Sequence, residues 1–122
     1  MAVHGHTRPE WIKEIHRGFL AAGCDGIETN TFNASQIVLD DFGMGDKLVE
    51  INRRNIKLAK EAVAEFASPD RPRFVIGSIG PGTKMPSLTD PAIYADFNKI
   101  ADAYRPQIRV MIEERVDALL IE

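Results

Sequence analysis

The sequence predicts an α/β protein, namely about three βα units of a larger (β/α)8 TIM barrel whose strands run parallel. Short predicted strands at residues 26–33, 73–78 and 116–122 alternate with longer stretches in which apolar residues recur at helical spacing. Small polar residues gather at the C-terminal end of the first predicted strand and glycines follow the second, as in the ligand-facing loops of parallel sheets. The chain has 122 residues, whereas a complete barrel needs about 250. We therefore expect part of a barrel.

The composition excludes several classes of protein. Hydrophobic residues make up 44% and charged residues 27% of the chain, and the net charge is −3. No apolar run approaches the roughly 18 residues of a membrane span, and the mixed charge gives no footprint for nucleic acid. The N-terminus has neither the basic region nor the apolar core of a signal peptide, so we expect a cytoplasmic location. We expect residues 1–6 to be disordered or tag-like and residues 7–122 to form the partial barrel domain.

Cysteine and histidine offer no metal site. The single cysteine, Cys24, rules out an internal disulfide and a multi-cysteine metal cage within this chain. It follows Gly23 at a predicted helix end, where a structural thiol is expected more often than a catalytic one. His4, His6 and His16 have no ligand spacing. The sequence thus predicts no metal ligands in this segment.

The first predicted helix begins at Thr7 and ends at Gly23. Thr7 and Glu10 have the spacing of a capping box, Pro9 is tolerated in the first turn, and Gly23 suits the C-terminal cap. The apolar positions of this helix are Ile12, Ile15 and Phe19. A two-residue turn then leads into the first strand.

The remaining elements follow the same alternation. We expect a short helix at residues 35–39, a loop at 40–45, a long helix at 47–67 with Asp46 as its N-cap, and a strand at 73–78. A loop at 79–88 precedes a helical region that opens at Asp90-Pro91 and runs to about Glu114. Pro106 should kink or split that region. Its inward face is predicted at Ile108, Met111 and Ile112, and the last strand follows.

The first candidate site is the cluster Thr29, Asn30 and Thr31 at the end of the first strand. At the mouth of a parallel sheet their hydroxyls and amide could bind a carboxylate or an amine. Alternatively, they cap the strand and satisfy the backbone of the loop. The residues alone support the two alternatives about equally.

Two further candidates lie at the ends of the next strands. Ser78, Gly80 and Gly82 belong to a glycine-rich loop whose exposed N–H groups could meet an anion, although a plain structural turn is the simpler interpretation. The spacing of that loop is not that of a P-loop, so a nucleotide is not expected. Glu122 ends an apolar strand, where its carboxylate could pair with a substrate ammonium group or could have no such role.

Taken together, these motifs resemble one family. The stretches Thr7-Arg8-Pro9, Ala22-Gly23 and 28–34 (Glu-Thr-Asn-Thr-Phe-Asn-Ala), the glycine loop at 77–84 and the closing stretch 117–122 are similar to the homocysteine S-methyltransferase domain. The similarity is closest to the homocysteine-binding module of cobalamin-dependent methionine synthases. It extends from about Thr7 to Glu122.

The resemblance implies a zinc-dependent methyltransferase of which this chain would form roughly the second to fourth barrel strands. In that family zinc holds homocysteine as a nucleophilic thiolate, which takes a methyl group and becomes methionine. Methylcobalamin, recharged by methyltetrahydrofolate in other modules, is the methyl carrier in methionine synthase. By motif, Thr29 and its neighbours would contact the amino-acid end of homocysteine, Glu122 would receive its ammonium group, and the glycine loop would help to close the barrel mouth.

The sequence also departs from the family pattern. The zinc cysteines of the family lie beyond Glu122, and the opening Asp-Gly motif of its first strand is missing. Glu114-Arg115 stands where paired glycines are common, and Pro106 is unexpected in its helix. We therefore expect the isolated chain to be inactive, with the rest of the barrel and a cobalamin module as its partners. The alternatives are another barrel enzyme for a small acid, or a non-catalytic piece that self-associates through open sheet edges.

Overall fold

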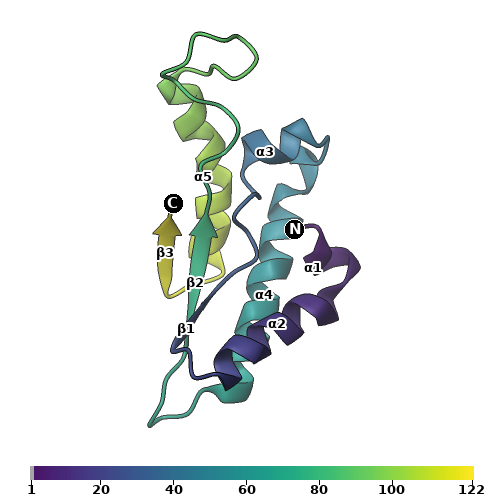
Figure 1. Ribbon diagram of the computed structural model, residues 1–122, viewed down its shortest axis with the longest axis vertical. Coiled ribbons are helices and arrows are strands. Elements are labelled where there is room, and N and C mark those ends of the chain that lie inside the picture. Colours follow the sequence, from purple (N-terminus) through teal and green to yellow (C-terminus); the bar gives the residue numbers. More distant parts are fainter. Residues whose placement is uncertain (1) are drawn as a thin grey trace.

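The computed structural model describes residues 2–122 and contains one parallel sheet of three strands (Figure 1). The strands are β1 (Gly26–Glu28), β2 (Phe74–Ile79) and β3 (Ala118–Ile121), in the spatial order β1-β2-β3. Ile27 pairs with Val75, and Ile79 pairs with Ile121. The predicted α/β class and parallel strand order are confirmed, although β1 is shorter than the apolar stretch suggested.

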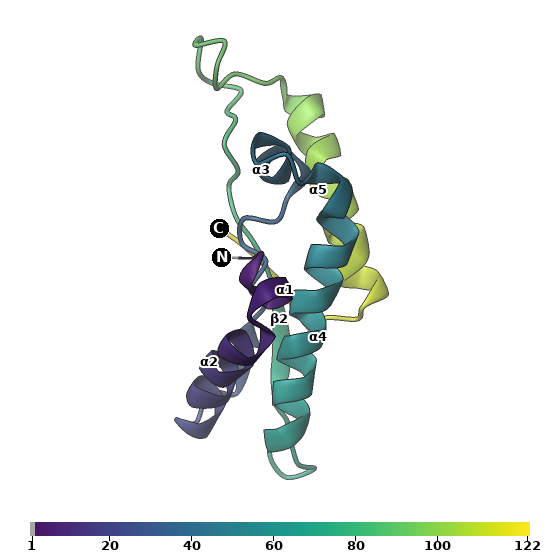
Figure 2. The ribbon, with the colours of Figure 1, turned by 90° about the vertical axis from the view of Figure 1, so that its right-hand side faces the viewer.

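Three long helices alternate with the strands. They are α2 (Pro9–Ala21), α4 (Leu48–Phe66) and α5 (Phe97–Glu113), joined by the short elements α1 (His4–Thr7), α3 (Gln36–Asp41) and η1 (Gly45–Lys47). The helix α4 lies between α2 and α5 in both views (Figures 1 and 2). Among residues 2–122, no helix has the length and hydropathy needed to cross a membrane.

The core lies between the sheet and these helices, in two clusters. Around β1 and the first half of β2, Ile27 and Val75 pack against Leu20, Ala59 and Ala62. Toward the other end of β2, a second cluster joins Ile79 to α3, α4 and α5; its members include Leu39, Leu48, Ile51, Ile56, Val110 and Met111. The sheet is thus anchored through one face, as expected for a barrel wall.

The beginning of the chain differs from the disordered segment that the sequence predicts. Met1 lies outside the described residues, but residues 4–7 form the helical turn α1 and Ala2 is only 5% exposed. The carbonyl of Ala2 accepts a hydrogen bond of 2.7 Å from the buried Asn55 side chain on α4. A buried partner outside the segment therefore orders it.

Two predicted helix starts are wrong. Thr7 does not cap α2: its hydroxyl points to the carbonyl of Val3, and Arg8 is the N-cap without a side-chain bond. Asp46 lies inside η1 and caps nothing, so α4 begins after Lys47. In both places a preceding helical turn occupies the residue that would otherwise have capped the helix.

The third long helix begins later than Asp90-Pro91 and is not split. Asp90 forms a turn instead, in which its side chain accepts from the Ala92 N–H. The N-cap of α5 is Asp96, whose carboxylate accepts from the Lys99 N–H at 3.0 Å. Pro106 lies inside an unbroken helix, because the buried residues just beyond it pack α5 against α4 and the sheet.

Several predicted inward positions are exposed. Ile15 and Phe19 on α2 are 50% and 58% exposed, and Ile112 on α5 is 66% exposed, whereas Ile12 and Met111 are buried as predicted. Ile15 and Phe19 lie on the side of α2 that faces the open edge of β1. The apolar faces of α2 and α5 are therefore wider than the surfaces that they bury in this chain.

The turn between α5 and β3 is strained at Arg115. This residue has a φ of 55°, and it is the one non-glycine residue with positive φ among residues 2–122. The left-handed region costs an ordinary residue about 1–2 kcal/mol. The structure thus explains why glycine would suit position 115, whereas Glu114, with a φ of −80°, has an ordinary helical conformation.

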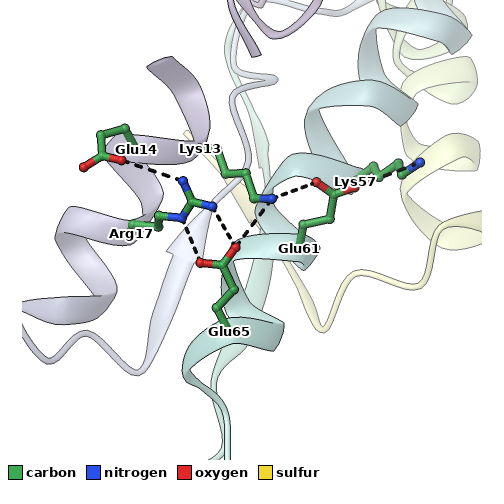
Figure 3. A network of polar contacts seen from close by, with 6 residues as sticks. All are labelled: Lys13, Glu14, Arg17, Lys57, Glu61 and Glu65. Carbon is green, nitrogen blue, oxygen red and sulfur yellow. Dashed lines mark hydrogen bonds and ion pairs between the residues drawn. The ribbon is translucent and has the colours of Figure 1, made fainter. Parts of the chain in front are cut away.

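The outer surfaces of α2 and α4 are joined by charged side chains, which we call the α2–α4 ion network (Figure 3). Its members are Lys13, Glu14, Arg17, Lys57, Glu61 and Glu65. The guanidinium of Arg17 binds the Glu65 carboxylate through two hydrogen bonds of 2.8 and 2.9 Å. Lys13 bridges Glu61 and Glu65 at 3.2 and 3.4 Å. The network orients two helices on the outer surface.

Candidate functional site

The segment 29–34, which we call the strand-end loop, leaves β1 at the carboxyl edge of the sheet. The Thr29 N–H donates to the carbonyl of Ile76 at 2.8 Å, so the pairing with β2 continues one residue past the strand. The Thr31 N–H then donates to the Thr29 carbonyl, and the Ala34 N–H donates to the Thr31 carbonyl. The loop is thus a tight turn at the end where ligands bind in parallel α/β folds.

The two threonine hydroxyls lie inside the protein. Thr29 is 3% exposed and Thr31 is fully buried. The Thr31 hydroxyl donates to the Ser78 carbonyl at 2.7 Å, and the Thr29 hydroxyl accepts from the Ser78 N–H at 3.1 Å. The 2.7 Å contact between the two hydroxyls is therefore a donation from Thr29 to Thr31. These hydroxyls therefore satisfy backbone groups, as in the structural alternative, although the backbone they bind belongs to Ser78 in β2 and not to a loop.

Three side-chain amides hold the strand-end loop from the helices, and we call them the amide clamp: Asn52, Asn55 and Gln107. All three are 0% exposed. Asn52 donates to the Ala34 carbonyl at 2.9 Å, and Gln107 donates to the Thr31 carbonyl at 2.8 Å. The Asn55 side chain accepts from Asn30 at 3.2 Å. Buried amides of this kind fix a loop because each unmade bond would cost free energy.

The glycine loop lies beside the strand-end loop. The Gly80 N–H donates to the Phe32 carbonyl at 2.9 Å, and the Gly80 carbonyl accepts from the Tyr104 hydroxyl at 2.9 Å. A Cβ at Gly80 would lie 2.5 Å from that Phe32 oxygen, so the close approach requires glycine here. Gly82 has a φ of 76°, which also suits glycine. Burial raises the pKa of Tyr104, so its hydroxyl keeps the proton that it donates.

Glu122 reaches the same edge of the sheet. Its N–H donates to the Ile79 carbonyl at 3.1 Å, and its side chain is exposed. The predicted site residues Thr29, Thr31, Ser78, Gly80 and Glu122 therefore converge at the carboxyl ends of three adjacent strands. Asn30 joins them through Asn55, and Gly82 lies just beyond.

Two kinds of residue near the strand ends were not among the predicted site residues. Glu28 is exposed, and it alternates with the buried Ile27, so it points to the face of the sheet that the helices do not cover. The alternation of a charged residue with an apolar one was the available signal. The amide clamp was also missed, although Asn52 and Asn55 fall at helical spacing within the apolar stripe of α4.

The site has no metal-binding cluster of its own. Among residues 2–122, no three His, Cys, Asp or Glu side chains gather as a metal ion would require. Cys24 is free and half-buried, away from the strand ends. What these residues can do chemically is bind and orient a small polar molecule through backbone groups and a carboxylate.

The fold and the polar strand ends define part of a ligand-binding (β/α) barrel, and comparison with known proteins specifies which. The family model for homocysteine S-methyltransferase matches residues 2–122, so the chain belongs to that family. The methionine synthases of Mycobacterium tuberculosis and Mycobacterium leprae are 37% and 36% identical to it over 120 residues. Each match covers 98% of this chain and 10% of the relative.

Solved structures agree on the fold. The homocysteine methyltransferase of Escherichia coli in its metallated form has a TM-score of 0.77 at 20% identity, over 100% of this chain and 46% of that protein. Its oxidised form gives 0.76 at 19% identity, over 97% and 43%. The chain therefore spans about a tenth of the methionine synthases and less than half of this methyltransferase barrel.

A groove of about 410 Å³ lies between α2 and the open edge of β1. It is lined mainly by apolar side chains, among them Ile12, Ile15, Phe19 and Ile27, with the buried His16 beside them. Burial lowers the pKa of His16, which favours its neutral form. In a closed barrel every strand has a neighbour at both edges. We therefore interpret the groove as a packing surface.

Proposed function

We propose that this chain is the homocysteine-binding part of a homocysteine S-methyltransferase of the methionine synthase type. The parent enzyme would transfer a methyl group to the sulfur of homocysteine and give methionine. The observation that carries the proposal is the convergence of the strand-end loop, the glycine loop and Glu122 at one edge of the sheet. Membership of the family supports the choice of homocysteine over another small acid.

In this proposal each group has one task. Thr29, Thr31 and Ser78 hold the strand-end loop in shape, so that Asn30 and the loop backbone meet the amino-acid end of homocysteine. Gly80 and Gly82 let the second loop approach closely at the barrel mouth. The exposed Glu122 carboxylate receives the ammonium group, since a charged acceptor binds an ammonium donor more strongly than a neutral one.

Zinc and cobalamin enter the proposal only through parts of the parent outside this chain. The described residues do not fit a zinc site, because no suitable ligand cluster is present among them. The zinc ligands would come from the rest of the barrel, and cobalamin and methyltetrahydrofolate would belong to other modules. We propose a cytoplasmic location for the parent, as for a soluble enzyme of amino-acid synthesis.

The test is homocysteine turnover by the full-length protein and its Glu122→Gln variant. We expect the KM for homocysteine to rise about 10-fold or more, since a hydrogen bond to a charged group contributes about 1.5–3 kcal/mol. Asp70→Asn, which removes an exposed carboxylate in the turn before β2, is the control and should leave KM unchanged. The 122-residue chain alone, supplied with zinc and a methyl donor, should form no methionine. Methionine formation by that chain would contradict the proposal.

A second candidate role is self-association of the isolated chain. β1 and β3 each have one edge without a strand partner among residues 2–122, and Ile121 on β3 is 73% exposed. Open edges of this kind pair readily with other strands. Sedimentation of the chain at several concentrations tests this role, and a monomer at every concentration would argue against it.

A further inference from the structure

We propose that Gln107 is a positioning residue for homocysteine binding, acting through the carbonyl of Thr31. This inference rests on the proposed function, and it adds a residue on α5 that belongs to neither the strand-end loop nor the glycine loop. Gln107 is 76 residues from Thr31 in sequence. Its role is therefore visible only in the fold.

The side chain of Gln107 is used entirely as a donor. It is 0% exposed, and its Nε2 group donates to the Thr31 carbonyl at 2.8 Å and to Asn52 Oδ1 at 3.2 Å. Both partners are acceptors, so they fix the orientation of the amide. Its Oε1 atom has no hydrogen-bond partner among the described residues. A buried amide is costly in a core, and this one has half of its polar capacity unmet.

The contact fixes the middle of the strand-end loop. The Thr31 carbonyl accepts from both Gln107 and the Ala34 N–H, and the Thr31 hydroxyl binds β2 through the Ser78 carbonyl. Gln107 also binds Asn52, which itself donates to the Ala34 carbonyl. Both ends of the turn at 31–34 therefore depend on the same pair of helices.

Loss of this contact should loosen the loop and leave the rest of the barrel wall in place. Without Gln107, the Thr31 carbonyl would keep only the local bond from Ala34, so the turn could shift relative to α5. Asn30 lies directly before Thr31 and would move with it. A displacement of about 1 Å in a positioning group can lower activity substantially, and here we expect the loss in substrate binding.

The experiment uses the full-length protein that contains this chain and its Gln107→Met variant. Methionine has a similar length and no amide, so the substitution removes both donations and also the unpartnered oxygen. We expect the KM for homocysteine to rise about 10-fold, while kcat and the KM for the methyl donor change less than about 2-fold. Val110→Ala, one turn further along the same buried face of α5, is the matched control. It should lower the unfolding midpoint and leave the KM for homocysteine unchanged.

The outcomes separate this inference from the proposed function. If the wild-type protein turns over homocysteine and Gln107→Met leaves the KM for homocysteine unchanged, or raises the KM for homocysteine and for the methyl donor by the same factor, Gln107 has no positioning role. If the wild-type protein does not act on homocysteine, the proposed function and this inference both fail.

A second variant covers the case in which Gln107→Met does not fold. Gln107→Glu keeps the shape, and its neutral form still has one proton to donate to the Thr31 carbonyl. We expect a KM for homocysteine close to that of the wild type in acidic buffer, rising in alkaline buffer as the carboxylate forms. A KM for this variant with the same pH profile as the wild type would overturn the inference.

Discussion

Two polar networks in this chain differ in their burial, their charge and the groups that they join. The α2–α4 ion network lies on the outer surface and joins two helices through full charges, such as the Arg17–Glu65 pair. The amide clamp and the threonines of the strand-end loop are buried and uncharged, and they join side chains to backbone. The first network could be replaced by many other charge arrangements, whereas the second specifies the position of one turn.

The difference follows from solvent. Exposed ion pairs gain little, because water and salt screen the charges and two long side chains lose freedom. A buried neutral hydrogen bond also adds little net stability when it forms. If one partner is removed, however, the other is left buried without a hydrogen bond, because water cannot reach it. Removing one member of the buried network should therefore cost much more than removing one member of the exposed network.

The largest effect is expected from Thr31→Val. Valine keeps the shape but loses the donation to the Ser78 carbonyl and the acceptance from Thr29, in a site that is 0% exposed. We expect a loss of about 2–3 kcal/mol in the free energy of unfolding, measured by denaturant titration. Thr83→Val is the control, because the exposed Thr83 hydroxyl binds the exposed Asp41 carboxylate. Equal losses in the two variants would remove the distinction between buried and exposed contacts.

A smaller loss is expected from Gly80→Ala. The new Cβ would lie 2.5 Å from the Phe32 carbonyl oxygen, so the two loops would have to separate, at about 1–2 kcal/mol. Gly18→Ala is the matched control: in α2 the new Cβ would have no neighbour within 4 Å, and the helix should gain up to about 1 kcal/mol. Thermal unfolding of both variants measures the contrast. An unchanged midpoint for Gly80→Ala would mean that the strand-end loop moves freely.

The smallest effect is expected from Glu65→Gln. The hydrogen bonds from Arg17 lower the pKa of Glu65 to about 2, from an ordinary value of 4.5. A depressed carboxyl pKa stabilises the folded state above the unfolded pKa, and this contribution is lost as the pH falls from about 4.5 toward 2. The small difference in unfolding midpoint between the wild type and Glu65→Gln should therefore shrink across that range. A difference that grows on acidification would contradict this assignment.

The sequence predicted those helices and strands that are determined by residues close together in the chain. The apolar stretch predicted as a strand at 73–78 forms β2 at Phe74–Ile79, and the small polar residues after Ile27 marked the end of β1. Local signals failed where a competing local structure existed. Asp90-Pro91 has the features of a helix start, but the Asp90 side chain closes a turn on Ala92, and Asp96 caps the helix instead.

The partners of the site could not be predicted, because they come from distant segments. Nothing local shows that the Thr29 hydroxyl accepts from the Ser78 N–H, or that Gln107 donates to Thr31. Polar residues on a helix usually face solvent, so Asn52 within an apolar stripe gives a signal only once the stripe is compared residue by residue with the helical period. The choice between ligand contact and loop support therefore required the fold.

The helix α5 serves two loops with one face. Tyr104 donates to the Gly80 carbonyl, and Gln107, three residues later and on the same side, donates to the Thr31 carbonyl. The amide hydrogens of Gly80 and Ala34, which bind the Phe32 and Thr31 carbonyls, should therefore exchange with deuterium through one shared opening event. Both should be slow for loop positions, and both should become faster together when α5 is loosened. The two loops at the mouth of this barrel segment then open and close together, because α5 holds both of them.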